Sequence, residues 1–187
     1  DMRSGLERLS YAIMIVLIAT MAAWLMALAL HLKPVDFLPL NLSMLQYIVF
    51  RLLASFCGVF GFSIMFNSPV PLSAAVIGAI SNTLRLELVD LASLPPAAAA
   101  FFAAMIAGLL ASAYKKHSGF PRIAITVPSI VIMVPGLYLY RAIYNLGMMN
   151  LSISASWFAS ATLIILALPL GLIFARIMTD KMFRYCT

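Results

Sequence analysis

The sequence predicts an all-α membrane protein, a polytopic helical bundle of about six spanning segments in which the fifth helix is broken or kinked. The first supporting observation is composition, because 64% of the 187 residues are hydrophobic, 10% are charged, and the mean hydropathy is +1.07. A soluble domain is closer to half apolar and a quarter charged. The second is that the apolar residues gather in runs of about 20, the length that crosses a bilayer as a helix.

Six apolar runs account for the predicted spans. The third is short and rich in small residues, and the fourth opens with two prolines, whose missing N–H groups would be unpaired at a helix N-terminus in any case. Pro169 is expected to bend the sixth. The predicted spans cover residues 9–32, 45–66, 70–86, 95–114, 123–146 and 155–177.

The fifth span contains the residues that predict its break. Pro128 and Pro135 each remove a backbone donor, and Gly136 follows Pro135 directly. In lipid, the carbonyl groups freed by a break must be satisfied by other helices or by water in a cavity. We therefore expect the helix to break near Pro135 and Gly136, beside protein or water.

The positions of lysine and arginine predict the orientation. With a cytoplasmic N-terminus, eight of the 12 basic residues lie inside, two lie outside, and Arg51 and Arg141 fall within spans. This distribution follows the positive-inside rule and predicts that both termini are cytoplasmic. Omitting the short third span would put the basic stretch 115–122 outside, so the charge bias also supports that span.

Two connecting segments complete the expected organisation. Residues 33–44 are expected at the outer interface, and 67–71 are expected to form a tight inner turn. Two regions are therefore expected. Residues 1–44 comprise the first spanning helix and the outer interfacial segment, and residues 45–187 form the membrane domain. Because the chain begins at Asp1 without an initiator methionine, we expect it to be processed or cut from something longer.

The residues that enzymes and metal sites need are missing from the spans. His31 and His117 sit at span ends, so no metal-ligand cluster, catalytic triad or carboxylate pair is expected in the membrane, and no cofactor. Neither glycine-rich phosphate loop occurs, and the basic residues form no run of five that would suggest nucleic-acid binding. All six acidic residues lie outside the spans: Asp1, Glu7, Asp36, Glu87, Asp90 and Asp180.

Three arginines fall at similar depth near the outer ends of spans two, three and five. A charge within a span costs about 2.5–3.5 kcal/mol on insertion scales, and no in-membrane acid of this chain is expected to pair with them. For Arg51 and Arg85 we favour extension of the side chain to the outer headgroups. For Arg141 this interpretation and a substrate contact are equally supported.

A first group of candidate substrate contacts follows the expected break. Pro135 and Gly136 would begin an outer half-helix whose N-terminal dipole favours an anion, and Tyr138, Tyr140 and Arg141 follow on it. Transporters build substrate sites from such broken helices. The alternative is a plain proline kink with tyrosines in the outer aromatic belt.

A second group lies on the short third span and the turn before it. Asn67, Ser81, Asn82 and Arg85 are candidate substrate contacts, because polar groups in a short helix belong inside a bundle or along a cavity rather than against lipid. Hydrogen bonding between helices and a pore-lining role remain equally open. At the rim, Glu87 and Asp90 are the candidates for proton coupling.

Two of these stretches also carry a family resemblance. GFSIMFNSP (61–69) followed by LSAAVIGAISNTLR (72–85) shows a G-F-x-x-x-F-N-x-P turn and a small-residue helix that ends in arginine. VPSIVIMVPGLYLYRAIY (127–144) shows a P-G-x-x-x-Y turn. In this order, over about residues 47–176, they resemble the all-membrane C-terminal half of the threonine/serine exporter family of bacterial inner-membrane proteins. The stretch MRSGLERLSYAIMIVLIATMAAWLMAL (2–28) is similar to the last helix of that family's N-terminal half.

The resemblance implies a component of a bacterial inner-membrane secondary exporter of small carboxylates. It implies threonine and serine as substrates, or dicarboxylates such as succinate, as in split-type relatives. It also implies an N-terminal partner half, fused or separate, and makes this chain one helix of that half followed by the whole second half. A non-transporting assembly subunit is the other interpretation, and a homo-oligomer is left open.

Overall fold

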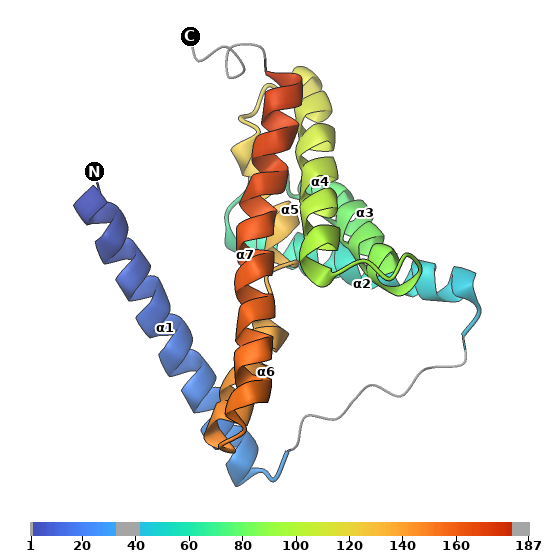
Figure 1. The fold of residues 1–187 in the computed structure, drawn as a ribbon. Coiled ribbons are helices and arrows are strands. Elements are labelled where there is room, and N and C mark those ends of the chain that lie inside the picture. Colours follow the sequence, from blue (N-terminus) through green and yellow to red (C-terminus); the bar gives the residue numbers. More distant parts are fainter. Residues whose placement is uncertain (1, 33–41, 181–187) are drawn as a thin grey trace. The chain divides into compact units, whose positions relative to one another are not determined.

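The computed structural model describes residues 2–32 and 42–180, and all regular secondary structure in these ranges is helical (Figure 1). Five of the helices are long and apolar enough to cross a membrane, and the interrupted pair α5–α6 makes a sixth span if it is counted as one. The predicted polytopic helical bundle is therefore confirmed. The helices are α1 (Met2–Ala29), α2 (Met44–Met65), α3 (Pro71–Asp90), α4 (Pro96–Ser118), α5 (Ile123–Val131), α6 (Gly136–Gly147) and α7 (Leu151–Thr179).

The break in the fifth span lies where the prolines predict it. Because Pro135 has no N–H group, it cannot donate to the carbonyl of Val131, and α5 ends at that residue. A turn follows in which Val134 N donates to the Val131 carbonyl over 3.1 Å. The next helix, α6, begins at Gly136 with Pro135 as its N-cap.

The turn between α2 and α3 is also formed as expected. Asn67 adopts a left-handed backbone with φ of 50°, which asparagine tolerates better than most residues. Ser68 N donates to the Ser63 carbonyl over 2.9 Å, closing the end of α2. The Ser68 hydroxyl donates to the Ala124 carbonyl over 2.9 Å, so the turn is tied to the start of α5.

The third helix is longer than the sequence predicts. The expected span ends at Leu86, because hydropathy falls at Glu87, but α3 continues to Asp90. Glu87 and Asp90 therefore lie on the same helix as the small residues and not beyond it. The bend expected at Pro169 stays a prediction, since α7 is helical through that residue.

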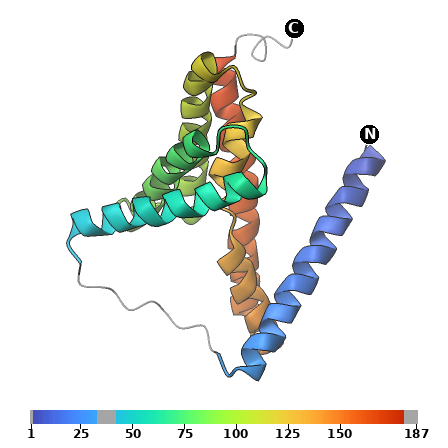
Figure 2. The same ribbon diagram turned by 180° about the vertical axis from the view of Figure 1, so that it is seen from behind.

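The chain consists of two compact units. Unit 1 comprises Asp1–Pro39 and Pro135–Ala161, and unit 2 comprises Leu40–Val134 and Thr162–Thr187. In unit 2, α3 is the central helix, because it packs on α2, α4 and α5 (Figure 2).

Small residues make this packing of unit 2 close. A Cβ atom on Gly78 would lie 2.7 Å from Val59 Cγ2, so α3 meets α2 at van der Waals distance there. Gly108 of α4 meets Ala175 of α7 in the same way, and Gly171 of α7 meets the backbone of Phe101 in α4. In lipid, such close approach replaces the hydrophobic effect as the force that holds helices together.

Unit 1 contains α1, α6 and the first part of α7. Gly147 at the end of α6 lies against the indole of Trp24 in α1, where a Cβ would come within 2.3 Å of Cζ2. The Ser154 hydroxyl of α7 donates to the Ala142 carbonyl of α6 over 2.6 Å.

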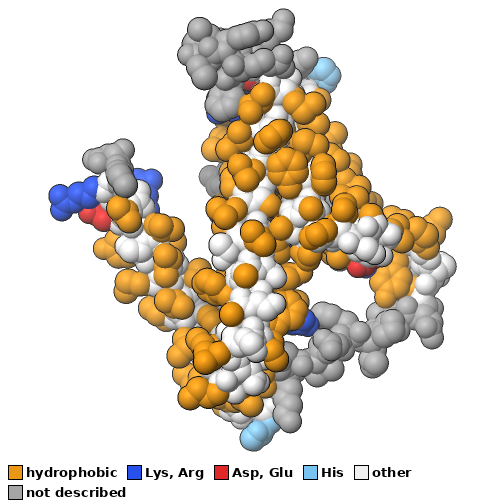
Figure 3. Space-filling view, viewed as in Figure 1, with side chains coloured by type: hydrophobic (Ala, Val, Ile, Leu, Met, Phe, Trp, Pro, Cys, Tyr) orange, Lys and Arg blue, Asp and Glu red, His pale blue; other side chains and the backbone are white. Residues whose placement is uncertain are grey.

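The helix surfaces are suited to lipid. Large apolar side chains are exposed along α1, among them Tyr11, Ile15 and Ile18, and the space-filling view shows them as an almost continuous cover (Figure 3). Charged side chains on this helix gather at its N-terminal end, where Arg3 pairs with Glu7 over 3.5 Å. The chain is thus a multi-pass membrane protein by its surface as well as by its hydropathy. The expected interfacial segment 33–44 falls almost wholly outside the described residues.

Candidate functional site

The most polar part of unit 2 is the second half of α3. Ser81, Asn82 and Thr83 follow one another and are all buried, with exposed fractions of 0%, 5% and 6%. Buried polar groups are rare in a helix that crosses lipid, since each needs a hydrogen-bond partner. We call Ser55, Ser81, Asn82, Thr83 and Arg85 the α3 polar cluster.

One side of this cluster is satisfied by α2. The Asn82 amide Nδ2 donates to the hydroxyl of Ser55 over 2.8 Å. Within the ranges that the structure describes, three oxygens of the cluster are buried and have no hydrogen-bond partner: Ser81 Oγ, Asn82 Oδ1 and Thr83 Oγ1. A buried polar atom without a partner costs about 1–3 kcal/mol, so a water or a ligand that donates to Asn82 Oδ1 and bonds the two hydroxyls would stabilise this part of the fold.

Arg85 connects the cluster to the break in the fifth span. Its Nη1 donates to the carbonyl of Met133 over 3.1 Å. That carbonyl lies in the turn between α5 and α6, where the helical ladder is interrupted. The favoured expectation for Arg85, extension to the headgroups, stays a prediction, and the structure adds an acceptor within the chain, the carbonyl freed at the break.

The expectation that no in-membrane acid of this chain pairs with Arg51 is wrong, because Glu87 and Asp90 lie on the candidate spanning helix α3. Its Nη1 lies 2.8 Å from Glu87 Oε1, and its Nη2 contacts Asp90. The side chains of Arg51 and Glu87 are about four-fifths buried, with exposed fractions of 21% and 18%. The Arg51 guanidinium also lies over the ring of Tyr47, 5.1 Å from its centroid. We call Arg51, Glu87 and Asp90 the outer ion-pair group.

The outer ion-pair group and the α3 polar cluster are neighbours on the same interface. Ser55 lies one helical turn from Arg51 on α2, and Asn82 lies little more than one turn from Glu87 on α3. The α2–α3 interface thus carries an amide–hydroxyl bond and, one turn further, an ion pair. Two arginines, two carboxylates and three oxygens in need of donors are gathered in this part of unit 2.

The remaining predicted contacts lie elsewhere. Asn67 is exposed in the turn before α3, and the first residue of that helix, Pro71, already lies about 16 Å from Asn82 at 1.5 Å per residue. The structure therefore does not bring it to the α3 polar cluster. Pro135 is buried, whereas Gly136 is exposed with nothing within 4 Å of a Cβ placed on it.

In unit 1, the predicted α6 contacts form an aromatic group with Trp157. The Arg141 guanidinium lies over the Trp157 ring, 4.8 Å from its centroid, and the Tyr138 ring meets the same indole edge-on at 5.4 Å. Tyr140 pairs instead with Tyr144, with ring centroids 6.3 Å apart. Trp157 was not among the predicted residues, although its position near the start of the sixth span could have suggested it.

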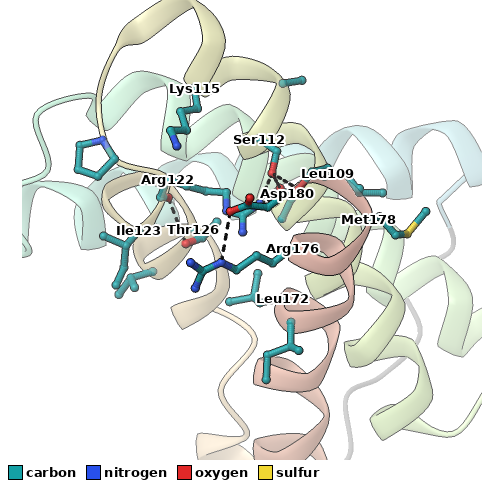
Figure 4. A pocket seen from close by; sticks show the side chains of 16 residues that line it. Leu109, Ser112, Lys115, Arg122, Ile123, Thr126, Leu172, Arg176, Met178 and Asp180 are labelled. Atoms are coloured by element: carbon teal, nitrogen blue, oxygen red, sulfur yellow. Dashed lines mark hydrogen bonds and ion pairs between the residues drawn. The ribbon is translucent and has the colours of Figure 1, made fainter. Parts of the chain in front are cut away.

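A cavity of about 1030 Å³ opens at the other end of unit 2, between the end of α4, the start of α5 and the end of α7 (Figure 4). Three basic side chains, Lys115, Arg122 and Arg176, line it together with Asp180. We call this the basic cavity. None of its residues was predicted as a site, although the basic stretch 115–122 and the basic C-terminal end of the last span are both expected inside.

Arg122 holds the walls of the basic cavity together. Its Nη1 donates to the hydroxyl of Thr179 over 2.9 Å and contacts the hydroxyl of Ser112, which links α4, α5 and α7. Burial, and after it the positive charge of Arg176, lower the pKa of the Arg122 guanidinium from its usual value, while Asp180 acts in the opposite direction. Since an arginine keeps its proton far above neutral pH, the group remains a cation.

These arrangements favour binding rather than covalent chemistry. In the part of the chain that the structure describes, no three His, Cys, Asp or Glu side chains are grouped to hold a metal ion. The second half of α3 and the facing part of α2 instead carry guanidinium donors, carboxylates and neutral polar groups. A small solute that carries charges of both signs is matched by such a set.

Comparison with known proteins gives one match. A protein-family model described as Threonine/Serine exporter, ThrE, matches residues 51–178. This range is more than half of the chain, and it contains the α3 polar cluster, the outer ion-pair group and most of the basic cavity. No curated protein and no solved structure matches the chain.

Proposed function

This chain belongs to the threonine/serine exporter family, and we propose on that premise that it is a component of a secondary exporter that moves threonine and serine out of a bacterial cell across the inner membrane. The family consists of exporters, so the activity expected is transport and not catalysis. We further propose that both termini face the cytoplasm and that an N-terminal half, fused or separate, completes the carrier.

One observation carries the choice of substrate, namely the buried oxygens of the α3 polar cluster. Ser81, Asn82 and Thr83 present three oxygens that find no donor among the described residues. Threonine and serine bring donors, because each has an ammonium group and a hydroxyl. An ionised dicarboxylate has acceptors only, so it would leave the Asn82 Oδ1 atom unpaired. The cluster therefore favours a hydroxylated amino acid over a dicarboxylate such as succinate.

The carboxylate of such a substrate has its complement in the same interface. Arg85, which donates to the Met133 carbonyl through Nη1, carries a positive charge that would attract this carboxylate. Arg51 is held by Glu87 and Asp90, so a zwitterion could exchange with this group, its carboxylate toward Arg51 and its ammonium toward the acids. We propose Glu87 and Asp90 as the groups that couple transport to protons. In unit 1, we retain Arg141, Gly136 and their neighbours on α6 as proposed contacts.

The test measures threonine release from cells that lack their own exporters and are loaded with a threonine-containing dipeptide. The chain is expressed alone and then with an N-terminal half, and membrane abundance is checked by immunoblot. We expect release with the partner, and we expect Arg141→Met and Arg85→Met to reduce it without lowering abundance. Arg8→Met at the exposed start of α1 is the matched control, because it removes the same charge outside the proposed path.

Each outcome separates the alternatives. Release of succinate but not threonine would move the substrate to dicarboxylates. Release with the partner that none of the variants reduces would favour a non-transporting assembly subunit. Absence of any release at normal abundance would contradict the proposal.

A further inference from the structure

The basic cavity has a lining that differs from the α3 polar cluster. Lys115, Arg122 and Arg176 bring three positive charges, against one negative charge from Asp180, which pairs with Arg176 over 3.8 Å and leaves the lining with a net positive charge. Arg122 is partly buried and lies close enough to Arg176 for the two cations to affect each other electrostatically. An anion placed in the cavity would be attracted by this lining and would lessen the repulsion between the two guanidinium groups.

The size and the apolar walls of the basic cavity indicate what kind of anion fits. Its volume of about 1030 Å³ reaches the upper end of the roughly 300–1,000 Å³ that hold drug-sized ligands, which is far more than one amino acid needs. Beside the charged residues it is lined by Ile123 and Val127 of α5 and by Leu172 and Ile173 of α7. A ligand that fills it therefore has an anionic head and an apolar body.

The place of the basic cavity on the helices fits the same ligand. Arg122 precedes α5 directly, Arg176 lies in the last turn of α7, and Lys115 lies near the end of α4. Helix ends of membrane spans lie at the level of lipid headgroups, and basic pockets between spanning helices bind the phosphate of anionic lipids. The hydroxyls of Ser112 and Thr179, both in contact with Arg122, add neutral hydrogen-bonding groups at the same level.

We propose that the basic cavity is a binding site for the phosphate headgroup of an anionic phospholipid, with its acyl chains along the apolar walls formed by α5 and α7. The phosphate would lie between Lys115, Arg122 and Arg176. Because Arg122 joins α4 to α7 through Ser112 and Thr179, a lipid bound there would stabilise the closed arrangement of these helix ends. This site is independent of the proposed substrate path.

The test titrates the purified full chain in neutral detergent with phosphatidylglycerol and, separately, with phosphatidylcholine. Native mass spectrometry counts retained lipid, and thermal unfolding reports stabilisation. We expect phosphatidylglycerol to be retained and to raise the unfolding midpoint by several degrees, whereas phosphatidylcholine has little effect. Arg176→Gln and Lys115→Gln should each weaken binding about tenfold, the loss expected for one charge-assisted contact. These positions are chosen because Arg122→Gln would also break the links to Ser112 and Thr179.

Arg8→Gln on α1 is the matched control, because it removes one exposed positive charge that is expected on the same side of the membrane but outside the basic cavity. An equal loss of binding in this control would overturn the proposal, since the attraction would then be non-specific. If inorganic phosphate raised the unfolding midpoint as much as phosphatidylglycerol does, the ligand would be a free anion, and the proposal of a lipid ligand would be overturned. Stabilisation by threonine that Arg176→Gln removes would assign the cavity to the substrate path instead. Equal effects of the two lipids would also overturn the proposal.

Discussion

Arg85 and Met133 show how single residues keep a broken helix compatible with a membrane. Pro135 has no N–H group to donate to the carbonyl of Val131. This carbonyl accepts instead from Val134 N, one residue before Pro135, and the Met133 carbonyl accepts from Arg85. These two carbonyls thus have donors inside the protein, which suits a break in the bilayer core, where water is absent. The charge on Arg85 is accommodated by the same contact that closes the break.

The buried oxygens of Ser81, Asn82 and Thr83 differ from these carbonyls, because they have no hydrogen-bond partner among the described residues. Buried polar atoms without partners lower the free energy of unfolding. Ligand-binding sites often contain such atoms, because they form their hydrogen bonds when the ligand is bound. This argument applies to each hydroxyl separately and can be tested by a change that removes the oxygen and keeps the shape.

Thr83→Val is that change. Because the Thr83 hydroxyl is buried and has no partner among the residues that the structure describes, its removal should raise the free energy of unfolding, by up to about 1–3 kcal/mol. Threonine efflux should fall about fivefold to tenfold, the effect of one lost hydrogen bond of about 1 kcal/mol. Thermal unfolding in detergent and the release assay measure the two effects.

The matched control is Thr20→Val in α1, whose hydroxyl already donates to the Val16 carbonyl over 2.6 Å. It should leave efflux unchanged. If Thr83→Val stabilises the protein and efflux stays at the wild-type rate, the hydroxyl does not touch the substrate.

Among the elements, α3 depends most on close packing. It is the most buried of the candidate spans, and Gly78 meets both α2 and α5, because a Cβ there would lie 2.7 Å from Val59 and 3.0 Å from the Cα of Ser129. The second contact is with backbone, which cannot turn aside as a side chain can. The Ser129 hydroxyl also donates to the Ala74 carbonyl over 2.9 Å, one turn before Gly78. The position of the polar cluster therefore rests on this small-residue contact.

Gly78→Ala should separate α3 from its neighbours and lower the free energy of unfolding by about 1–3 kcal/mol, the usual cost of overpacking. Gly61→Ala in α2 is the control, because nothing lies within 4 Å of its Cβ and a helical alanine is favoured over glycine by about 0.5–1 kcal/mol. Thermal unfolding of both variants in the same detergent provides the measurement. Equal midpoints would show that the contact between α2 and α3 is looser than described.

At the scale of the whole molecule, the even number of spans links the two ends of the chain. If α5 and α6 form one span, the described residues contain six, and an even number predicts that both termini lie on the same side of the membrane. The excess of basic residues at the N-terminus, in the α4–α5 connection and after α7 predicts that this side is the cytoplasm. The α3–α4 connection, next to Asp90 of the outer ion-pair group, is then outside.

Reporter fusions test this orientation. A fluorescent protein fused after Thr187 should be bright, and alkaline phosphatase inserted at Ser93, between α3 and α4, should be active, because the latter enzyme needs an oxidising, external compartment. An inactive insertion at Ser93 together with an active one at Gly119, between α4 and α5, would invert the orientation.

Local features of the sequence determined the spans, the turn at 67–71 and the break at Pro135, because hydropathy over about 20 residues and the chemistry of proline act within one segment. They also singled out Ser81, Asn82 and Arg85 as polar residues in a span. Only the tertiary structure decided that Arg51 pairs with Glu87, that Arg85 reaches the Met133 carbonyl, and that Arg122 and Arg176 line one cavity. These contacts join residues 36 or more positions apart, and they depend on how each helix is rotated against its neighbours. Hydropathy carries no information on that rotation when nearly every face is apolar, so the sequence could not predict that Arg51 pairs with Glu87 or that Arg85 donates to the Met133 carbonyl.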